Sequence, residues 1–170
     1  MAHGSLVAIQ IGREAEGRLE SVAEVRAIPG KGLEGDRYFR GEGSFSKKPG
    51  GGRQVTLVAS EMLELLQREH GIALEAAETR RNLVTKGVLL NDLVGQVFQV
   101  GTVRMMGVRL AEPCNHLEGL TRPGVIKGLV HRAGLRADIL DEGVLRVGDA
   151  IVANPNPQSL TSNLNLHIWP

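Results

Sequence analysis

The sequence has very little cysteine: Cys114 is the only one among 170 residues. A lone cysteine cannot form a disulfide within its own chain, so any special role must be chemical, as a nucleophile, a sulfur carrier or a metal ligand. A free cysteine also often serves as a small buried hydrophobe, and its position alone leaves that interpretation open. With one cysteine and no charged-then-apolar signal pattern in the first residues, we expect a cytoplasmic protein.

Aromatic residues and excess charge are also scarce. Aromatic residues make up 3% of the chain, and the formal net charge is +1. A base-stacking surface needs more aromatic rings, and a nucleic-acid-binding surface usually has a strong positive bias. The chain has no run of about 18 apolar residues, the length that a membrane-spanning helix needs. We therefore expect a small-molecule ligand, with neither a nucleic acid nor a membrane as partner.

Glycine, in contrast, is abundant at 22 residues, and its many dipeptides with turn-forming residues indicate short strands joined by turns. Gly101-Thr102 favours a tight hairpin, and Asp141-Glu142-Gly143 is expected to pair the two strands that flank it. Strands are predicted at residues 6–11, 22–28, 54–58, 82–85, 96–100, 103–110, 135–140 and 144–151.

Helices are predicted at fewer places. Apolar residues at helical spacing predict a helix over residues 61–70, with Ser60 as N-cap and Gly71 as the stop. Shorter helices are expected at residues 75–79 and 123–132. The pattern favours a mainly β fold, a β-barrel with helical insertions. One domain is expected over residues 1–154, with a tail at 155–170.

The surroundings of Cys114 favour a chemical role. The strand predicted at residues 103–110 stops before Pro113, so Cys114 is expected to begin a loop at a strand end, where reactive groups tend to lie. His116 follows two residues later, but a single Cys/His pair is a weak zinc pattern, since structural zinc needs four ligands. We interpret His116 as an exposed loop histidine.

Arginines stand next to predicted strands. Arg53 directly precedes one strand and should be held rigidly by it. Arg80, Arg81 and Asn82 follow one another where a helix passes into another strand. A guanidinium fork suits phosphate or carboxylate, and an amide can bind a heterocycle edge, although paired surface arginines are often simply solvated. Because adjacent strand side chains diverge, only one of Arg80 and Arg81 is expected to face a pocket.

Segments along nearly the whole chain, from about residue 5 to residue 153, occur in the order seen in MOSC domains. The family is named for the C-terminal domain of molybdenum cofactor sulfurase. The segments that carry the resemblance are Gly32-Leu33-Glu34-Gly35-Asp36-Arg37-Tyr38, Arg53-Gln54-Val55-Thr56-Leu57, Arg80-Arg81-Asn82-Leu83-Val84-Thr85-Lys86-Gly87, Asn91-Asp92-Leu93-Val94-Gly95, Glu112-Pro113-Cys114, Leu129-Val130-His131-Arg132-Ala133-Gly134 and Gly148-Asp149.

The resemblance implies a β-barrel of the MOSC or pyruvate-kinase β-barrel-like type. In the amidoxime-reducing members the cofactor is a molybdenum-bearing pterin, and the family cysteine, which matches Cys114, ligates the metal. The resemblance also implies that the pterin phosphate and ring are held at the positions matching Arg53, Arg80, Arg81, Asn82 and Arg132. A thiolate is a fitting ligand for a metal bound to soft dithiolene sulfurs.

The function expected from this resemblance is that of a molybdenum-cofactor-binding oxidoreductase component that reduces N-hydroxylated small molecules, with Cys114 on the metal. The alternative is a sulfur carrier that holds a persulfide on Cys114 for the assembly of a cofactor or a metal–sulfur cluster. A third is a module that senses or stores the cofactor. Larger family members carry electron-relay or desulfurase domains that this chain lacks, so a reductase or a cysteine desulfurase is expected as partner.

Overall fold

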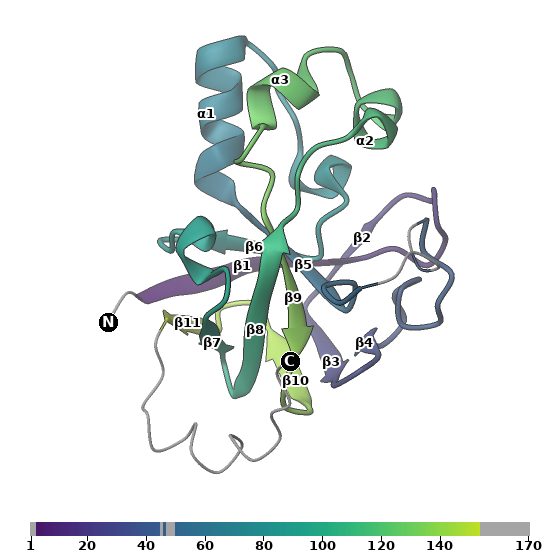
Figure 1. Ribbon diagram of the computed structural model, residues 1–170, viewed down its shortest axis with the longest axis vertical. Helices are drawn as coiled ribbons and strands as arrows, with labels where there is room; N and C mark the ends of the chain where they lie inside the picture. Colours follow the sequence, from purple (N-terminus) through teal and green to yellow (C-terminus); the bar gives the residue numbers. More distant parts are fainter. Residues whose placement is uncertain (1–2, 45, 47–49, 154–170) are drawn as a thin grey trace.

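A closed ring of seven strands forms the centre of the molecule (Figure 1), which confirms the predicted β-barrel. The computed structural model describes residues 3–44, 46 and 50–153. Around the ring, neighbouring strands follow the order β1, β11, β7, β8, β9, β5 and β6, and β6 returns to β1. The seven strands are β1 (His3–Ile11), β5 (Val55–Ala59), β6 (Leu83–Lys86), β7 (Val97–Val100), β8 (Val103–Leu110), β9 (Leu135–Ile139) and β11 (Ala150–Ala153).

Four short strands lie outside the ring. Strand β2 (Glu20–Val22) pairs with the end of β1 in the antiparallel direction, while β3 (Glu24–Ile28), β4 (Gly32–Leu33) and β10 (Gly143–Arg146) form a separate sheet with β3 in the middle. The predicted pairing of β9 with the strand after it is therefore wrong. Both edges of β9 are already paired, with β5 and with β8, so β10 pairs with β3 instead.

The barrel interior follows from the alternation of side chains along each strand. On β9 the buried residues Leu135, Ala137 and Ile139 alternate with Arg136 and Asp138, which are only partly buried. Large side chains from the other strands fill the centre with essentially no exposed surface, among them Leu6, Ile9, Leu57, Leu83, Phe98, Met105 and Ile151. The charged residues of β9, Arg136 and Asp138, therefore point away from the barrel interior.

Three helices gather at one end of the barrel (Figure 1). They are α1 (Ser60–His70), α2 (Asn115–Leu120) and α3 (Val125–Leu129), and 3-10 turns η1 (Ala76–Thr79) and η2 (Leu90–Leu93) accompany them. The helices share a small apolar cluster, separate from the barrel interior, that contains Leu66, Leu74, Leu117, Val125, Leu129 and Ala133. In the described residues, no helix has the length and apolar character needed to cross a lipid bilayer.

The helix predictions hold best where the end signals are strong. Helix α1 stops at Gly71, which has the left-handed φ of 67° that a helix C-cap favours. Its N-cap is Ala59, so Ser60 is the first helical residue and not the cap. The helix predicted at 123–132 is shorter, since Gly124 (φ 94°) and His131 (φ 61°) are left-handed on either side of it. The predicted tail at 155–170 lies outside the described residues.

Candidate functional site

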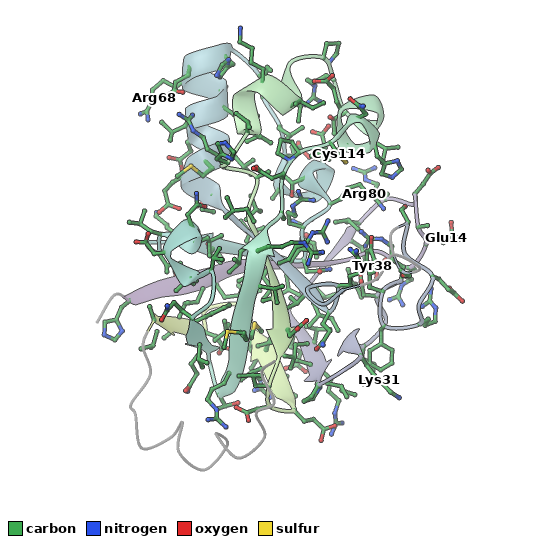
Figure 2. The ribbon with its side chains drawn as sticks, viewed as in Figure 1. Glu14, Lys31, Tyr38, Arg68, Arg80 and Cys114 are labelled. Carbon is green, nitrogen blue, oxygen red and sulfur yellow. The ribbon has the colours of Figure 1, made fainter. Side chains whose placement is uncertain are left out.

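A cavity of about 400 Å³ lies beside Cys114, at the junction of the barrel with α2. Figure 2 shows Cys114, Arg80 and Tyr38 together on this side of the molecule. The volume falls within the range of about 300 to 1,000 Å³ that small-molecule sites occupy. The lining residues are Arg37, Tyr38, Ser44, Arg53, Thr56, Arg80, Arg81, Arg109, Leu110, Glu112, Cys114, His116, Leu117 and Arg136.

Six arginines line this cavity, which we call the arginine cavity, against one carboxylate, that of Glu112, among the described residues. That carboxylate is already engaged, because Glu112 accepts hydrogen bonds from the backbone N–H of His131 at 2.6 Å and binds His131 Nδ1 at 2.5 Å. The nearby Asp36 pairs with Arg37 at 3.1 Å. The cavity therefore carries an excess of positive charge, which suits an anionic ligand.

Arg81 is buried, and its guanidinium donates hydrogen bonds to backbone carbonyls. It is 8% exposed, and its guanidinium donates to the carbonyls of Ala133 (3.0 Å), Thr79 (3.3 Å) and Ala111 (2.7 Å). Burial, and next the charge of Arg136, lower the pKa of Arg81 to about 10, while Cys114 acts in the opposite direction. Arg81 thus remains a cation at neutral pH, with its charge held by carbonyl dipoles.

Arg80 also faces the cavity, so the expectation that only one of the two arginines would do so is wrong. Arg80 has a left-handed φ of 61° and caps η1, so it precedes β6 and strand alternation does not apply to it. Its guanidinium donates to the carbonyls of Gly17 (2.7 Å) and Ala15 (2.6 Å), in the loop between β1 and β2. Burial lowers the pKa of Arg80, and the charge of Arg37 lowers it further.

Two arginines on neighbouring strands complete the cavity. A β-bulge on β8 between Gly107 and Arg109 brings Arg109 opposite Arg136 of β9. Arg109 donates to the carbonyl of Gly51 at 2.7 Å, and the pKa of Arg136 is lowered, chiefly by burial, with further lowering by Arg109 and Arg53. The bulge, a feature common beside functional sites, thus brings two positive charges together in the cavity that Cys114 also lines.

Cys114 is half-buried between the arginine cavity and the apolar cluster of the helices. It is the N-cap of α2, in extended conformation with φ −138° and ψ 171°, and its carbonyl accepts a hydrogen bond from Glu118 N at 3.0 Å. Helix α2 was not predicted. The interpretation of His116 as a loop residue is accordingly wrong: it lies on α2, lines the cavity, and approaches Ser44 Oγ at 3.4 Å.

The structure brings together Cys114, Arg53, Arg80 and Arg81, but it places the other two predicted site residues elsewhere. Asn82 is 3% exposed and does not line the cavity. Its amide oxygen accepts from Thr56 N and Oγ1, both at 3.1 Å, and its amide nitrogen donates to the Gln10 carbonyl at 3.1 Å and to Asp36 Oδ1 at 3.3 Å. Arg132 instead pairs with Glu69 of α1 at 2.8 Å and lines a separate cavity.

Three of the six arginines of the cavity were missed from the sequence: Arg37, Arg109 and Arg136. Arg37 stands in the segment Gly35-Asp36-Arg37-Tyr38, whose buried Asp36 accepts a hydrogen bond from Gly12 N at 2.8 Å and fixes the segment against β1. Arg109 and Arg136 occupy outward-facing strand positions. A charged residue within a predicted strand indicates an outward-facing position, and this signal was present in the sequence. It does not reveal which outward-facing positions the rest of the chain covers.

The comparisons with known proteins agree with this description of the fold. The family model of the MOSC domain matches residues 32–152. No curated protein matches the chain at a significant level. Among solved structures, the YuaD protein from Bacillus subtilis superposes with a TM-score of 0.75 at 14% identity, covering 91% of this chain and 97% of that one. YiiM from Geobacillus stearothermophilus gives a TM-score of 0.65 at 20% identity, with coverage of 89% and 75%. YiiM from Escherichia coli gives 0.64 at 16% identity, with coverage of 92% and 71%. At these identities the likeness shows the fold.

Proposed function

Because the chain belongs to the MOSC domain family, as the match over residues 32–152 shows, we propose that the arginine cavity binds a molybdenum-bearing pterin with Cys114 as ligand of the metal. In this proposal the protein is the substrate-reducing component of an oxidoreductase that acts on N-hydroxylated small molecules. The observation that carries it is the placement of six arginines and the single thiol of the chain around one cavity of about 400 Å³.

The charge of the cavity supports an anionic, phosphate-bearing cofactor. Burial lowers the pKa of Arg81 to about 10, which means that the protein holds this cation in an unfavourable environment. Its guanidinium donates hydrogen bonds to three backbone carbonyls. A bound phosphate would offset the unfavourable burial of this cation and the mutual repulsion of Arg81 and Arg136. Arg53 and Arg80, on two other segments of the wall, offer further forks to the same anion.

The chemistry of the thiol supports a metal that arrives with ligands of its own. Within the described ranges, no group of three or more His, Cys, Asp or Glu side chains is placed to hold a metal ion. A metal on Cys114 would then take its remaining ligands from a cofactor, as a dithiolene-bound metal does. Soft metals of that kind favour thiolate over oxygen ligands.

The bound cofactor would supply the redox chemistry, and the protein would supply binding, orientation and electrostatics. Cys114 would hold the metal, and its backbone is fixed as the N-cap of α2. The guanidiniums would neutralise the cofactor and set its orientation. His116 and Ser44 lie where the cavity meets a shallower hollow that Glu14 and Glu16 also line, so they would offer hydrogen bonds to an entering substrate.

The test is elemental analysis for molybdenum, combined with pterin fluorescence, on protein expressed in a cofactor-competent host. Wild type should carry near-stoichiometric molybdenum and pterin, and Cys114→Ala should lose the metal with an unchanged circular dichroism spectrum. The matched control is Arg146→Ala, since Arg146 pairs with Glu24 in an exposed position and does not line the cavity. Absence of molybdenum and pterin from wild type, or stoichiometric metal in Cys114→Ala, would refute the proposal.

A sulfur carrier is the second candidate, favoured by the half-buried position of Cys114 among guanidiniums. In that role the thiolate attacks the outer sulfur of a donor persulfide, takes that sulfur, and releases the donor thiolate. Incubation with a cysteine desulfurase and free cysteine should then add the mass of one sulfur atom to Cys114, removable by a thiol reductant. An unchanged mass in metal-free protein would reject this candidate.

A further inference from the structure

A short segment, residues 111–114, joins β8 to α2 and carries the only thiol of the chain. Residues 130–134, which join α3 to β9, run beside it. At one end the backbone connects the two segments, because Ala111 N donates a hydrogen bond to the Gly134 carbonyl at 2.8 Å. The position of the thiol therefore depends on how the remainder of the first segment is held.

The second connection is made by a side chain, that of Glu112. Its Oε1 accepts a hydrogen bond from the backbone N–H of His131 at 2.6 Å, and its Oε2 binds His131 Nδ1 at 2.5 Å. The next residue, Pro113, has no N–H with which the backbone could make such a connection. Two residues before Cys114, the carboxylate therefore takes the part that the backbone has at Ala111.

His131 has a backbone conformation that few residues adopt. Its φ is 61°, and among the described residues other than glycine only Arg80 also has a positive φ. A side chain in this region costs free energy unless the surroundings hold it there, and such residues cluster at functional sites. The N–H and the ring of His131 bind Glu112, and its carbonyl accepts a hydrogen bond from Asn91 Nδ2 at 2.8 Å. His131 is thus a fixed support for the carboxylate.

The position of Glu112 also bears on the charge of the site. Its carboxylate lines the arginine cavity, while its ion-pair partner His131 lines a separate cavity. A carboxylate released from His131 would be free to pair with the six guanidiniums and would compete there with an anionic ligand. The bonds to His131 therefore limit this competition.

We propose that Glu112 is a positioning residue that acts through His131. Its two hydrogen bonds hold the end of segment 111–114 against residues 131–134 and so keep the Cys114 thiol at the arginine cavity. The inference deepens the proposed function, because it rests on Cys114 as the reactive residue of the site. It applies equally to a thiol that ligates a metal and to one that carries sulfur.

The exposure of the thiol can be measured on the full-length, metal-free protein. Cys114 is allowed to react with N-ethylmaleimide, which is small, and separately with a maleimide that carries a polyethylene glycol chain. In both reactions the sulfur adds to the maleimide double bond, and the neighbouring carbon takes a proton from water. The ratio of the two rates, polymer over small reagent, therefore cancels the reactivity of the thiol and reports how often the segment opens. Because the chain has one cysteine, each reaction gives one product.

Four variants separate the hydrogen bonds from the charge. Glu112→Ala removes both bonds, and His131→Gly removes only the bond to the ring while suiting the positive φ. Glu112→Gln removes the charge but can keep both bonds, since its amide oxygen accepts from the backbone N–H and its amide nitrogen donates to a neutral ring. The matched control is Glu69→Ala, which frees the adjacent Arg132 from its ion pair at 2.8 Å and leaves the arginine cavity intact.

Each hydrogen bond lost should raise the rate ratio about five-fold, so we expect about five-fold for His131→Gly and about 25-fold for Glu112→Ala. Glu112→Gln and Glu69→Ala should stay near wild type, and thermal melts check that every variant is folded at the temperature used. A wild-type ratio in His131→Gly, or in a folded Glu112→Ala, would overturn the proposal. An equal rise in Glu112→Gln and Glu112→Ala would also overturn it, because the charge would then be the cause.

This experiment and the molybdenum analysis can fail independently. The maleimide rates are measured without metal, so a wild-type protein that binds no molybdenum would refute the proposed cofactor and leave the role of Glu112 to be decided by the rates. Unchanged rates in a protein that does bind molybdenum through Cys114 would refute only the role of Glu112.

Discussion

Two arginines with the same exposure but different partners permit a sharp test of the arginine cavity. Arg81 and Arg104 are each 8% exposed. Arg104 lies away from the cavity and binds Asp141 through Nε at 2.7 Å and through Nη2 at 2.9 Å. Arg81 lines the cavity and donates to three backbone carbonyls. We therefore compare Arg81→Met with Arg104→Met, which remove the same charge from equally buried positions.

In anion-free buffer the two substitutions should differ in their effect on the free energy of unfolding. Lowering the pKa of Arg81 from its ordinary value to about 10 corresponds to a cost of about 3 kcal/mol for keeping the cation in the folded state. Losing three hydrogen bonds costs about 1 kcal/mol each, so the two effects of Arg81→Met nearly cancel. Arg104→Met leaves Asp141 without its cation and should destabilise the protein by about 3 kcal/mol.

Inorganic phosphate should distinguish the two variants in the opposite way, because Arg81, and not Arg104, lines the proposed anion site. At a concentration of about 100 times its Kd, a ligand of the folded state adds about 2.7 kcal/mol of stability. For a chain of this size that corresponds to a rise in Tm of about 5–10 °C. Arg81→Met should lose most of this rise, and Arg104→Met should keep it. Thermal melts followed by circular dichroism, with and without phosphate, provide the measurement.

The pH dependence has a defined sign. Below about pH 10 Arg81 is charged in the folded and the unfolded chain, so its unfavourable burial is constant. Above about pH 10, and until the arginine of the unfolded chain also loses its proton, the unfolded chain binds more protons than the folded one, so the penalty from Arg81 decreases as pH rises. The phosphate-induced rise in Tm should instead shrink as pH passes through about 10. A full phosphate response in Arg81→Met, or an equal loss in Arg104→Met, would refute the assignment of the anion site.

Two further predictions concern the scaffold of the site. Gly134→Ala should destabilise the protein by more than about 3 kcal/mol in urea unfolding, because Gly134 has a φ of +117° and a Cβ there would lie 1.9 Å from the Leu57 carbonyl oxygen. Gly30→Ala, with a φ of +79° and no atom within 4 Å of its Cβ, should cost only about 1 kcal/mol, and equal urea midpoints would contradict this reasoning. Asn82→Leu should cost about 3 kcal/mol and speed the hydrogen exchange of the Thr56 amide, which donates to Asn82 Oδ1 at 3.1 Å. Asn91→Leu, which removes one exposed hydrogen bond to the His131 carbonyl, should cost less than about 1 kcal/mol, and protection of Thr56 that survives Asn82→Leu would refute the role given to Asn82.

The strands could be predicted because burial imposes a period of two on their sequences. On β9 the buried Leu135, Ala137 and Ile139 show it directly. The pairing of strands could be predicted only in part: Gly101-Thr102 joins β7 and β8 in the expected hairpin, but the partner expected for β9 is wrong. The turn signal Asp141-Glu142-Gly143 follows β9, but Asp141 binds Arg104 of β8 and both edges of β9 are occupied. A turn motif specifies a local reversal, while the partner of a strand depends on which edges remain open.

For the site, the family resemblance named residue types but not the directions of their side chains. It led to Cys114 and to three of the arginines around the cavity. It did not reveal that Asn82 satisfies its amide within the fold, or that Arg132 reaches Glu69 of α1. Nor did the sequence indicate the bulge on β8 that sets Arg109 opposite Arg136, since a one-residue shift of register leaves no clear pattern in the hydrophobic residues.

The pairing that closes the barrel has a consequence for synthesis on the ribosome. His3, Gly4 and Ser5 of β1 pair with Val152, Ile151 and Ala150 of β11, so the first described strand needs the last one. Until residues 150–152 emerge from the exit tunnel, the paired edges that β11 provides to β1 and β7 do not exist, and both strands stay open to foreign chains. Contacts so distant in sequence also form slowly. Ring closure is therefore a late step of folding, and the edges of β1 and β7 that β11 covers stay open until it takes place.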